Sequence, residues 1–421
     1  MDSFLEADIK HKDSVRLIGR LVATERVINE NLRLPKANRV SFEFDAINAR
    51  LAPDDALAAI EGRGDPSQIA LVKILTTEAK FRLLSGVDEV NDGQWYQITL
   101  CSRPATGPLA WASSLGSLGY EERAGFVVDE IRWLFSEEEA PLSPVGASVD
   151  PERDLAQKIA GACHFPANAN FESKAVTKLF RRIDRPYRIV VRDVGQASFC
   201  SAVDERGREL FHLDAGWPLP FNKKTAFTKP TINSRDAPVI LSHWDWDHLH
   251  GYYAIEGLAG GTWIAPIQRL GPGAKLVAHK LAADNRLIGV SSSISAKFLR
   301  FGVCQGAPGN LNQTGLWVRL TLKSNRSILF VGDADYDRVP RSMARYSSFL
   351  VATHHGATFT GDVVCPEYWD YRCRCVVSVG KGNGYGHPSH LAIEAHKNMG
   401  WSMEYTCEWH MASRGNRYLG P

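Results

Sequence analysis

Residues 241–250 hold the densest group of side chains that could bind a metal ion. Four potential ligands fall within six positions of this stretch: His243, Asp245, Asp247 and His248. In an extended segment every second side chain points to the same side, so His243, Asp245 and Asp247 are predicted to converge. The run from 249 to 255 is predicted to be helical, which places Asp247 and His248 at the entrance to a helix. The stretch therefore predicts a strand, a loop and a helix around a hydrolytic metal site.

Three further clusters of ligand-type residues follow predicted strands. Asp333 comes directly after the apolar run 328–331, and His354 and His355 come after 349–352. His387 stands in a glycine-rich loop beyond 376–379. A single histidine or aspartate at a strand end is usually an ordinary hydrogen-bonded polar residue. Four such clusters in one domain predict a shared site instead, and Asp214, which ends the run 210–213, is a candidate supporting acid that orients the ligand loop.

The elements that must position these residues begin at residue 187. Short strands alternate from there with turns and helices, and the predicted strands are 187–193, 198–203, 210–213, 238–242, 316–323, 327–331, 349–353 and 375–379. Strands alternating with helices, each ending in a polar cluster, predict a layered α/β domain with its site at one edge of a sheet.

Residues 1–150 show no chemical motif and are predicted to form a smaller α+β domain of unknown role. Helices are predicted over 68–84 and 120–138 from the spacing of apolar residues. Residues 151–186 are predicted to be a linker and a basic helix, and the hydrolase domain is predicted to span 187–421. The basic run beginning at Lys174 could contact a phosphate backbone, although a solvated helix face is the favoured interpretation.

The composition is that of a soluble globular protein. The chain has 421 residues, a hydrophobic fraction of 44%, a charged fraction of 23% and a formal net charge of +2. A chain of this length predicts two domains, and its near-neutral charge neither favours nor excludes a nucleic-acid partner. No signal peptide is apparent, and no apolar run is long enough to span a bilayer, so no membrane partner is expected. The eight scattered cysteines predict reduced thiols and a cytoplasmic location.

An ordered series of motifs runs through the second half of the chain: Asp193-Val194-Gly195-Gln196, Leu213-Asp214-Ala215-Gly216, the segment 243–248, the asparagine-bearing lead-in 312–318, Phe330-Val331-Gly332-Asp333, His354-His355-Gly356, Ser378-Val379-Gly380 and 383–388. By these motifs, residues from about 187 to 402 resemble a metallo-β-lactamase fold domain, and within that superfamily they are most similar to the soluble domain of the ComEC-like competence proteins. The resemblance implies an αββα sandwich, which the smaller α+β domain expected over 1–150 would precede.

Three features depart from the superfamily pattern. Asp245 stands where histidine is usual, although ComEC-like members resemble this chain in accepting aspartate there. A later histidine of many members has no obvious equivalent, and Asn310 and Asn312 lie near where it would be sought. The membrane channel of a competence protein has no counterpart, which argues against DNA uptake as the function.

The resemblance implies two divalent metal ions, Zn²⁺ or Mn²⁺. His243 and Asp245 would bind one ion, Asp247 and His248 would bind the other, and Asp333 would bridge the two. His354 would complete the second site, with His355 as the substitute if the assignment is off by one. The implied chemistry is attack by a metal-bridged hydroxide.

The implied catalytic residues are Asp247 and His387. His387 would contact the scissile phosphate or protonate the leaving oxygen, and a loop-anchoring role is an equally open interpretation. His355, His387 and Asn383 are candidates for substrate binding.

The leading prediction is a phosphodiesterase, most plausibly a nuclease that cleaves DNA. One alternative is a hydrolase of the same fold for small molecules such as lactones, thioesters or cyclic nucleotides. The other alternative is a metal-free binding module. The N-terminal domain could recruit a protein partner or substrate.

Overall fold

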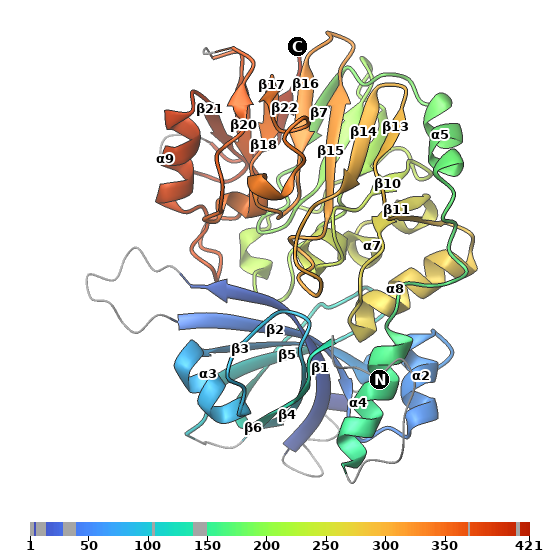
Figure 1. The fold of residues 1–421 in the computed structure, drawn as a ribbon, viewed down its shortest axis with the longest axis vertical. Coiled ribbons are helices and arrows are strands. Elements are labelled where there is room, and N and C mark those ends of the chain that lie inside the picture. The colour runs from blue at the N-terminus through green and yellow to red at the C-terminus, as the bar shows by residue number, and fades with distance from the viewer. Residues whose placement is uncertain are drawn as a thin grey trace. The chain divides into compact units, whose positions relative to one another are not determined.

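The computed structural model describes residues 4–5, 14–27, 39–102, 106–137, 150–368, 371–409 and 413–421. The chain divides into two compact units, which Figure 1 shows with the chain coloured along its length. Unit 1 comprises Met1–Ala167 and Gln268–Lys280, and unit 2 comprises Asn168–Ile267 and Leu281–Pro421. The chain therefore returns from unit 2 to unit 1 for a short segment, which has no counterpart in the domain boundaries predicted from the sequence.

Unit 1 contains a closed six-stranded barrel with the strand order β1-β2-β3-β5-β6-β4. Its strands are β1 (Ser14–Arg26), β2 (Arg39–Asn48), β3 (Ile69–Thr77), β4 (Trp95–Cys101), β5 (Leu109–Ser114) and β6 (Ala124–Phe135). Strand β1 closes the barrel because it pairs with both β2 and β4. Apolar side chains from every strand fill the interior.

In the described part of unit 1 the barrel is accompanied by α2 (Pro53–Ile60), η1 (Pro66–Gln68), α3 (Glu78–Ser85), α4 (Pro151–Ala162) and the start of α8 (Pro272–Ala283). The side chain of Phe81 on α3 stacks on Phe42 with ring centroids 4.0 Å apart. The buried carboxylate of Asp45 accepts the backbone N–H groups of Gly273 and Ala274, at 2.8 and 3.0 Å. Asp45 therefore satisfies free N–H groups at the start of α8.

Two helices predicted in the N-terminal region are wrong. The segment predicted as a helix over 120–138 is mainly strand β6. The segment predicted as a helix over 68–84 is strand β3 followed by the short helix α3, whose first turn begins where the Thr77 side chain accepts the N–H of Lys80.

Unit 2 contains two seven-stranded sheets. The first has the order β12-β11-β10-β9-β8-β7-β22. Its strands are β7 (Arg188–Val191), β8 (Cys200–Val203), β9 (Glu209–Leu213), β10 (Val239–Ile240), β11 (Trp263–Pro266), β12 (Leu287–Val290) and β22 (Arg417–Leu419). Strands β9 to β12 run parallel, whereas β22, β7, β8 and β9 pair antiparallel.

The second sheet has the order β13-β14-β15-β16-β18-β20-β21. Its strands are β13 (Ile294–Ala296), β14 (Leu299–Val303), β15 (Leu316–Thr321), β16 (Ser327–Phe330), β18 (Phe349–Val351), β20 (Arg374–Val377) and β21 (Ser402–Tyr405). The strands predicted over 316–323 and 327–331 are confirmed as β15 and β16, which pair as an antiparallel hairpin. Strands β16, β18, β20 and β21 run parallel, so their carboxyl ends share one edge.

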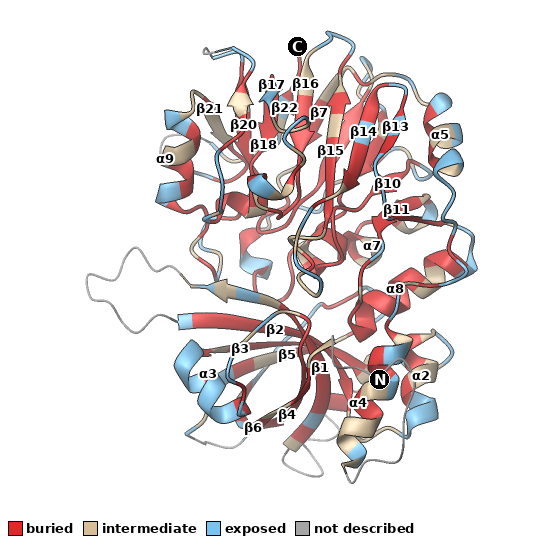
Figure 2. Cartoon of the chain, in the orientation of Figure 1, coloured by how far each residue is buried: buried red, intermediate tan, exposed pale blue. Residues whose placement is uncertain are grey.

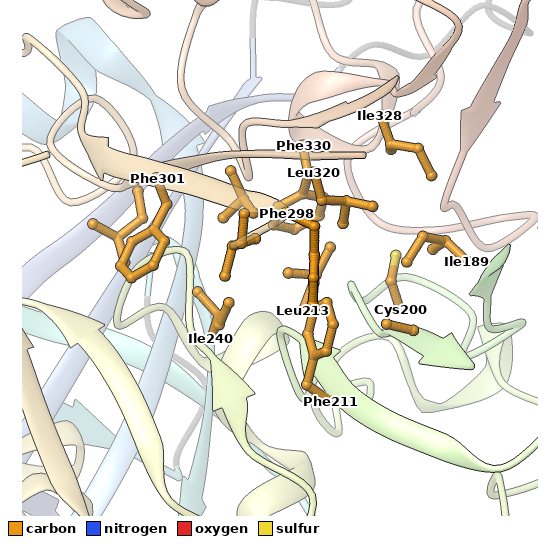
Figure 3. Packing of buried hydrophobic residues seen from close by; sticks show 14 of the residues in the cluster. Ile189, Cys200, Phe211, Leu213, Ile240, Phe298, Phe301, Leu320, Ile328 and Phe330 are labelled. Atoms are coloured by element: carbon orange, nitrogen blue, oxygen red, sulfur yellow. The ribbon is translucent and has the colours of Figure 1, made fainter. Parts of the chain in front are cut away.

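The main core of unit 2 lies between its two sheets. Figure 3 shows Phe211, Leu213 and Ile240 of the first sheet facing Leu320 and Phe330 of the second. Helix α5 (Ser173–Arg181) adds Val176 and Phe180 to this core, while its other face is exposed in Figure 2. None of the helices in the described ranges is long and apolar enough to cross a membrane.

Helices also pack on the faces of the sheets that point away from this core. Trp263 of β11 is fully buried and meets Tyr252 of α7 (Gly251–Ala254), with ring centroids 5.8 Å apart. On the second sheet, Leu350 and Cys375 join a cluster with Ile393 of α9 (His390–Asn398). The remaining elements of unit 2 are short: α6 (Trp246–Leu249), η3 (Lys223–Thr225), η4 (Leu258–Gly260), η5 (Tyr336–Arg338), η6 (Thr353–Gly356), β17 (Tyr346–Ser347) and β19 (Cys365–Pro366).

Candidate metal centre

The carboxyl ends of parallel strands from both sheets supply the candidate ligands. Each ligand segment follows its strand within a few residues: Asp214 follows β9, His243 follows β10, Asp333 follows β16, His354 and His355 follow β18, and His387 lies in the loop beyond β20. Ligand sites in α/β sheets collect at such edges because all the strand ends open there. The sequence pattern of ligand-type residues at strand ends therefore corresponds to one place in the fold.

Close backbone contacts join the two sheets at this edge. The N–H of Leu316 donates to the carbonyl oxygen of Ser242 at 2.6 Å. Gly332 has a φ of +57°, and a Cβ placed there would lie 2.6 Å from the Ser242 side chain. Only glycine readily adopts this φ and also lets the backbone come so close to Ser242. Gly332 therefore allows Asp333 to lie beside the 243–248 segment.

Asp214 is the centre of a buried hydrogen-bond network beneath the ligands. Its carboxylate accepts the backbone N–H of Ser242 at 2.6 Å and the Ser242 hydroxyl at 3.0 Å. Nδ1–H of His248 donates to the same carboxylate at 2.5 Å, and Nδ1–H of His243 donates to the Ser242 hydroxyl at 2.9 Å. With these donors each of these hydrogen bonds joins a donor to an acceptor. The carboxylate therefore orients the ligand loop, and it fixes one imidazole directly and the other through Ser242.

His355 is oriented by a backbone carbonyl. Its Nδ1 lies 2.8 Å from the carbonyl oxygen of Ser378, to which it donates, and its Nε2 lies 3.2 Å from Oδ2 of Asp247. His354 and His355 have φ values of +48° and +53°, a left-handed conformation that non-glycine residues seldom adopt. The chain turns sharply here and directs the two neighbouring rings to different places.

Ligand atoms come together in two groups among the described residues of unit 2. His243, His248 and Asp333 form one group, and Asp247, His248 and His355 form the other, with ligand atoms in each group within 4.8 Å of one another. Oδ1 of Asp333 lies 3.0 Å from Nε2 of His248, and Oδ2 of Asp245 lies 3.5 Å from Nε2 of His243. The structure therefore groups His355, and not His354, with Asp247 and His248.

The ring nitrogens that face this centre fit a metal ion. Nε2 of His243, His248 and His355 is buried and makes no hydrogen bond of good geometry within the described part of the chain. In each ring the opposite nitrogen, Nδ1, is already held by an oxygen. This arrangement, with one nitrogen anchored and the other directed at a shared point, is typical of histidines that bind metal. Imidazole and carboxylate together suit zinc or manganese.

The pKa shifts of the side chains at the centre also favour a bound cation. Burial acts to raise the pKa of Asp247, but His248 and His355 outweigh it and lower that pKa to about 2. Burial likewise opposes ionisation of Asp333, yet the neighbouring histidines hold its pKa well below the ordinary value. Burial acts to lower the pKa of His248, and the carboxylates around it raise that pKa well above its ordinary value. The carboxylates of Asp214, Asp247 and Asp333 thus favour positive charge at His248, and a divalent cation would be stabilised there.

His354 and Asp247 lie at the open side of the centre. Their side chains are 21% and 24% exposed, whereas those of His248 and Asp333 are 1% and 6% exposed. The rings of His354 and His387 are 5.6 Å apart. A substrate would therefore meet Asp247 and His354 first, and His387, which is itself buried, only behind them.

Asn383 holds the loop that carries His387. Its side-chain oxygen accepts the N–H groups of Tyr385, Gly386 and His387 at 2.9 to 3.1 Å. Its amide nitrogen donates to the carbonyl oxygens of Gly380 and His387 at 2.9 and 2.7 Å. The carboxamide is therefore occupied by its own loop, and substrate binding by Asn383 stays a prediction.

Sequence reasoning overlooked two residues that the structure places in this site. Ser242 links Asp214 to His243, and the carbonyl of Ser378 anchors His355. The position of Ser242 directly before His243 is a signal that could have found the first. No side-chain pattern could have found the second, because the acceptor is a backbone carbonyl.

No protein-family model matches the chain, and no curated protein matches it. One solved structure to which it is similar is described as a possible metal-dependent hydrolase from Veillonella parvula DSM 2008, with 10% sequence identity and a TM-score of 0.29. The match covers 52% of this chain and 97% of that chain. The function proposed below therefore rests on the geometry of the site.

Proposed function

We propose that this chain is a metal-dependent hydrolase of the metallo-β-lactamase fold that cleaves phosphodiester bonds in nucleic acid, with DNA as the expected substrate. The observation that carries the proposal is the set of three buried imidazoles whose Nδ1 atoms are anchored and whose Nε2 atoms face carboxylates. Such a set is built to hold metal and has no evident use in a metal-free binding module.

We assign the ligands to two divalent ions, Zn²⁺ or Mn²⁺. His243, Asp245 and Asp333 would hold one ion, and Asp247, His248 and His355 would hold the other, with Asp333 shared. The second set is one of the two ligand groups among the described residues of unit 2, and the approach of Asp333 to His248 supports the sharing. When bound, the two ions would lower the pKa of water and neutralise negative charge on the phosphoryl oxygens.

Residues of this chain would orient the metal ligands and supply the proton for the leaving oxygen. Asp214 and Ser242 keep His243 and His248 in the tautomer that presents Nε2. His387, whose ring lies 5.6 Å from that of the partly exposed His354, would contact the scissile phosphate and donate a proton to the leaving oxygen, since a histidine can donate near neutral pH. Asn383 would hold His387 in place for that transfer.

The exposed face of α5 supports a polyanionic substrate. Lys174, Lys178, Arg181 and Arg182 are all exposed, and no carboxylate in the described ranges pairs with any of them. Like-charged side chains without counter-charges attract a phosphate backbone over a distance of about one Debye length, roughly 8 Å at physiological salt.

The test combines metal analysis with cleavage. We expect purified protein to carry transition metal and, with Mn²⁺, to cleave labelled single- or double-stranded DNA. Asp247→Ala should lower the rate by more than about 100-fold, because losing even an outer partner of a ligand typically costs 10–100-fold. Asp284→Ala, which changes an exposed aspartate elsewhere in unit 2, is the matched control. Less than one metal ion per chain, or equal cleavage by wild type and Asp247→Ala, would contradict the proposal.

A further inference from the structure

A hollow of about 700 Å³ opens on unit 2 beside the loop that carries His387. Its lining includes Phe227, Lys229, Lys381, Glu408 and Arg414. The volume lies within the range of sites that hold small ligands or single nucleotides, roughly 300–1,000 Å³. The function proposed above assigns no role to any of these residues.

Phe227 presents an open aromatic face in this hollow. The residue is 86% exposed. The guanidinium of Arg414 lies 5.8 Å from the centre of its ring, and this guanidinium is fixed by Asp193 at 2.6 and 2.8 Å and by the carbonyl of Thr225 at 2.7 Å. A held guanidinium next to an exposed ring makes a stacking platform for a planar group.

The side chains that line the hollow carry more positive than negative charge. Its lining contains four cationic side chains, Arg192, Lys229, Lys381 and Arg414, and two anionic ones, Asp193 and Glu408. Arg192 also pairs with Glu209 at 3.0 Å, which leaves an excess of one positive charge. Lys229 has no carboxylate partner in the described part of the chain and lies 5.9 Å from the ring of Trp217. Lys381 contacts Glu408 in an exposed pair that a stronger anion can displace.

The hollow and the candidate metal centre are built on the same loops. Lys381 and His387 belong to one loop after β20, and the N–H of Gly384 in that loop donates to the Asn222 side chain at 2.9 Å. Thr225, three residues on, accepts the N–H of Gln196 at 2.8 Å. A ligand in the hollow therefore lies against the loop that positions His387.

We propose that this hollow binds single-stranded nucleic acid next to the bond that is cut, an inference that rests on the proposed function. One unpaired base stacks on Phe227, and the phosphates on either side contact Lys229 and Lys381. Stacking requires a base whose face is free, which a duplex does not offer along its length, whereas a single strand offers it at every nucleotide. The excess of cations matches a backbone with one negative charge per nucleotide.

Binding of a fluorescent oligothymidine to the full chain, followed by anisotropy in EDTA, tests the inference without cleavage. Phe227→Ala should weaken binding by about ten-fold, the effect of losing one base–aromatic stack. Lys229→Gln should reduce the slope of log affinity against log salt by about 0.7, which corresponds to one lost phosphate contact on a single strand. Tyr371→Ala is the matched control, because Tyr371 is 81% exposed and lies outside the lining.

The outcomes separate this inference from the proposed function. Equal affinity of wild type and Phe227→Ala for the single strand overturns the inference, whether or not the protein cleaves DNA. A loss of single-strand affinity in Phe227→Ala, with duplex affinity unchanged, supports it even where no cleavage occurs. Because Phe227 is largely exposed, the variant should melt at the wild-type temperature, and thermal unfolding checks this.

Discussion

At the scale of single residues, Asp214 orients two of the three buried histidines, His248 directly and His243 through Ser242. We predict that Asp214→Asn lowers the affinity for Zn²⁺ or Mn²⁺ by 10–100-fold. Asparagine keeps the shape and tolerates the left-handed φ of +56°, but its amide nitrogen cannot accept the Nδ1–H of His248 as a carboxylate does. Chelator competition measures the affinity.

The control for this prediction is Asp204→Asn. Asp204 accepts the N–H groups of Arg206 and Arg208 in a turn of unit 2, so it has a similar local role without the ligands. Unchanged metal affinity in Asp214→Asn would show that the network supports the fold and not the metal.

The two adjacent histidines after β18 give a second prediction. We expect His355→Ala to lose metal from the site, because Nε2 of His355 is buried 3.2 Å from Asp247. We expect His354→Ala to keep its metal and to cleave more slowly, because the His354 side chain is 21% exposed at the open side. Metal content per chain, measured on both variants side by side, decides between them, and the reverse result would restore His354 as the ligand.

The types of residue in the centre were predictable from the sequence, but their pairing was not. His243, His248 and Asp333 all follow strands in the sequence, and they meet in the structure. The choice between His354 and His355 depends on two consecutive left-handed residues and on the carbonyl of Ser378. Backbone conformation and backbone acceptors leave no mark in a pattern of side chains, so this part needed the structure.

At the scale of elements, β6 is a strand in which the spacing of apolar residues resembles that of a helix. Glu130 pairs with Thr99 and Val128 pairs with Leu100, so Asp129 is an extra residue that bulges from the strand. The bulge moves the next buried residue, Ile131, from the second to the third position after Val128. The apolar spacing then departs from two, and a periodicity argument favours a helix.

At the same scale, the loop of residues 380–387, which Asn383 holds in shape, leads to a prediction about metal content and cleavage. Asn383→Ala removes five hydrogen bonds that hold 380–387 in shape. We expect metal content to stay at the wild-type level and cleavage to fall by about ten-fold or more, since a small misplacement of a catalytic group is costly. The exposed Asn398 at the end of α9 supplies the control Asn398→Ala. Loss of metal in Asn383→Ala would mean that the loop supports the ligands as well.

At the scale of the whole molecule, local patterns identified eight strands of the two large sheets of unit 2, but neither β11 to β14, β21 and β22 nor the architecture of unit 1. The eight strands that were predicted are short apolar runs, most of them followed by a polar motif, so each can be recognised alone. The barrel of unit 1 depends on pairing between distant strands such as β1 and β4, and residues 268–280 join this unit from the middle of the other. Neither feature has a local signal, because both depend on contacts between segments far apart in the chain.

Two buried histidines should make the stability of the whole fold depend on pH. Burial lowers the pKa of His212 to about 3 and that of His250 to about 4. In the unfolded chain both would take up a proton near pH 6.5, so the unfolded state binds more protons as the pH falls below that value. The free energy of unfolding should therefore decrease from about pH 6.5 downward, by about 1.4 kcal/mol per pH unit for each histidine.

Replacing His212, whose Nδ1 lies 3.1 Å from the Ser201 hydroxyl, by glutamine removes one of the two groups. The loss of stability between pH 7 and pH 5 should then be smaller by about 2 kcal/mol than in the wild type. Urea unfolding at both pH values measures the difference, with the exposed His390→Gln as control. An identical pH dependence in wild type and His212→Gln would show that His212 takes up its proton in the folded state.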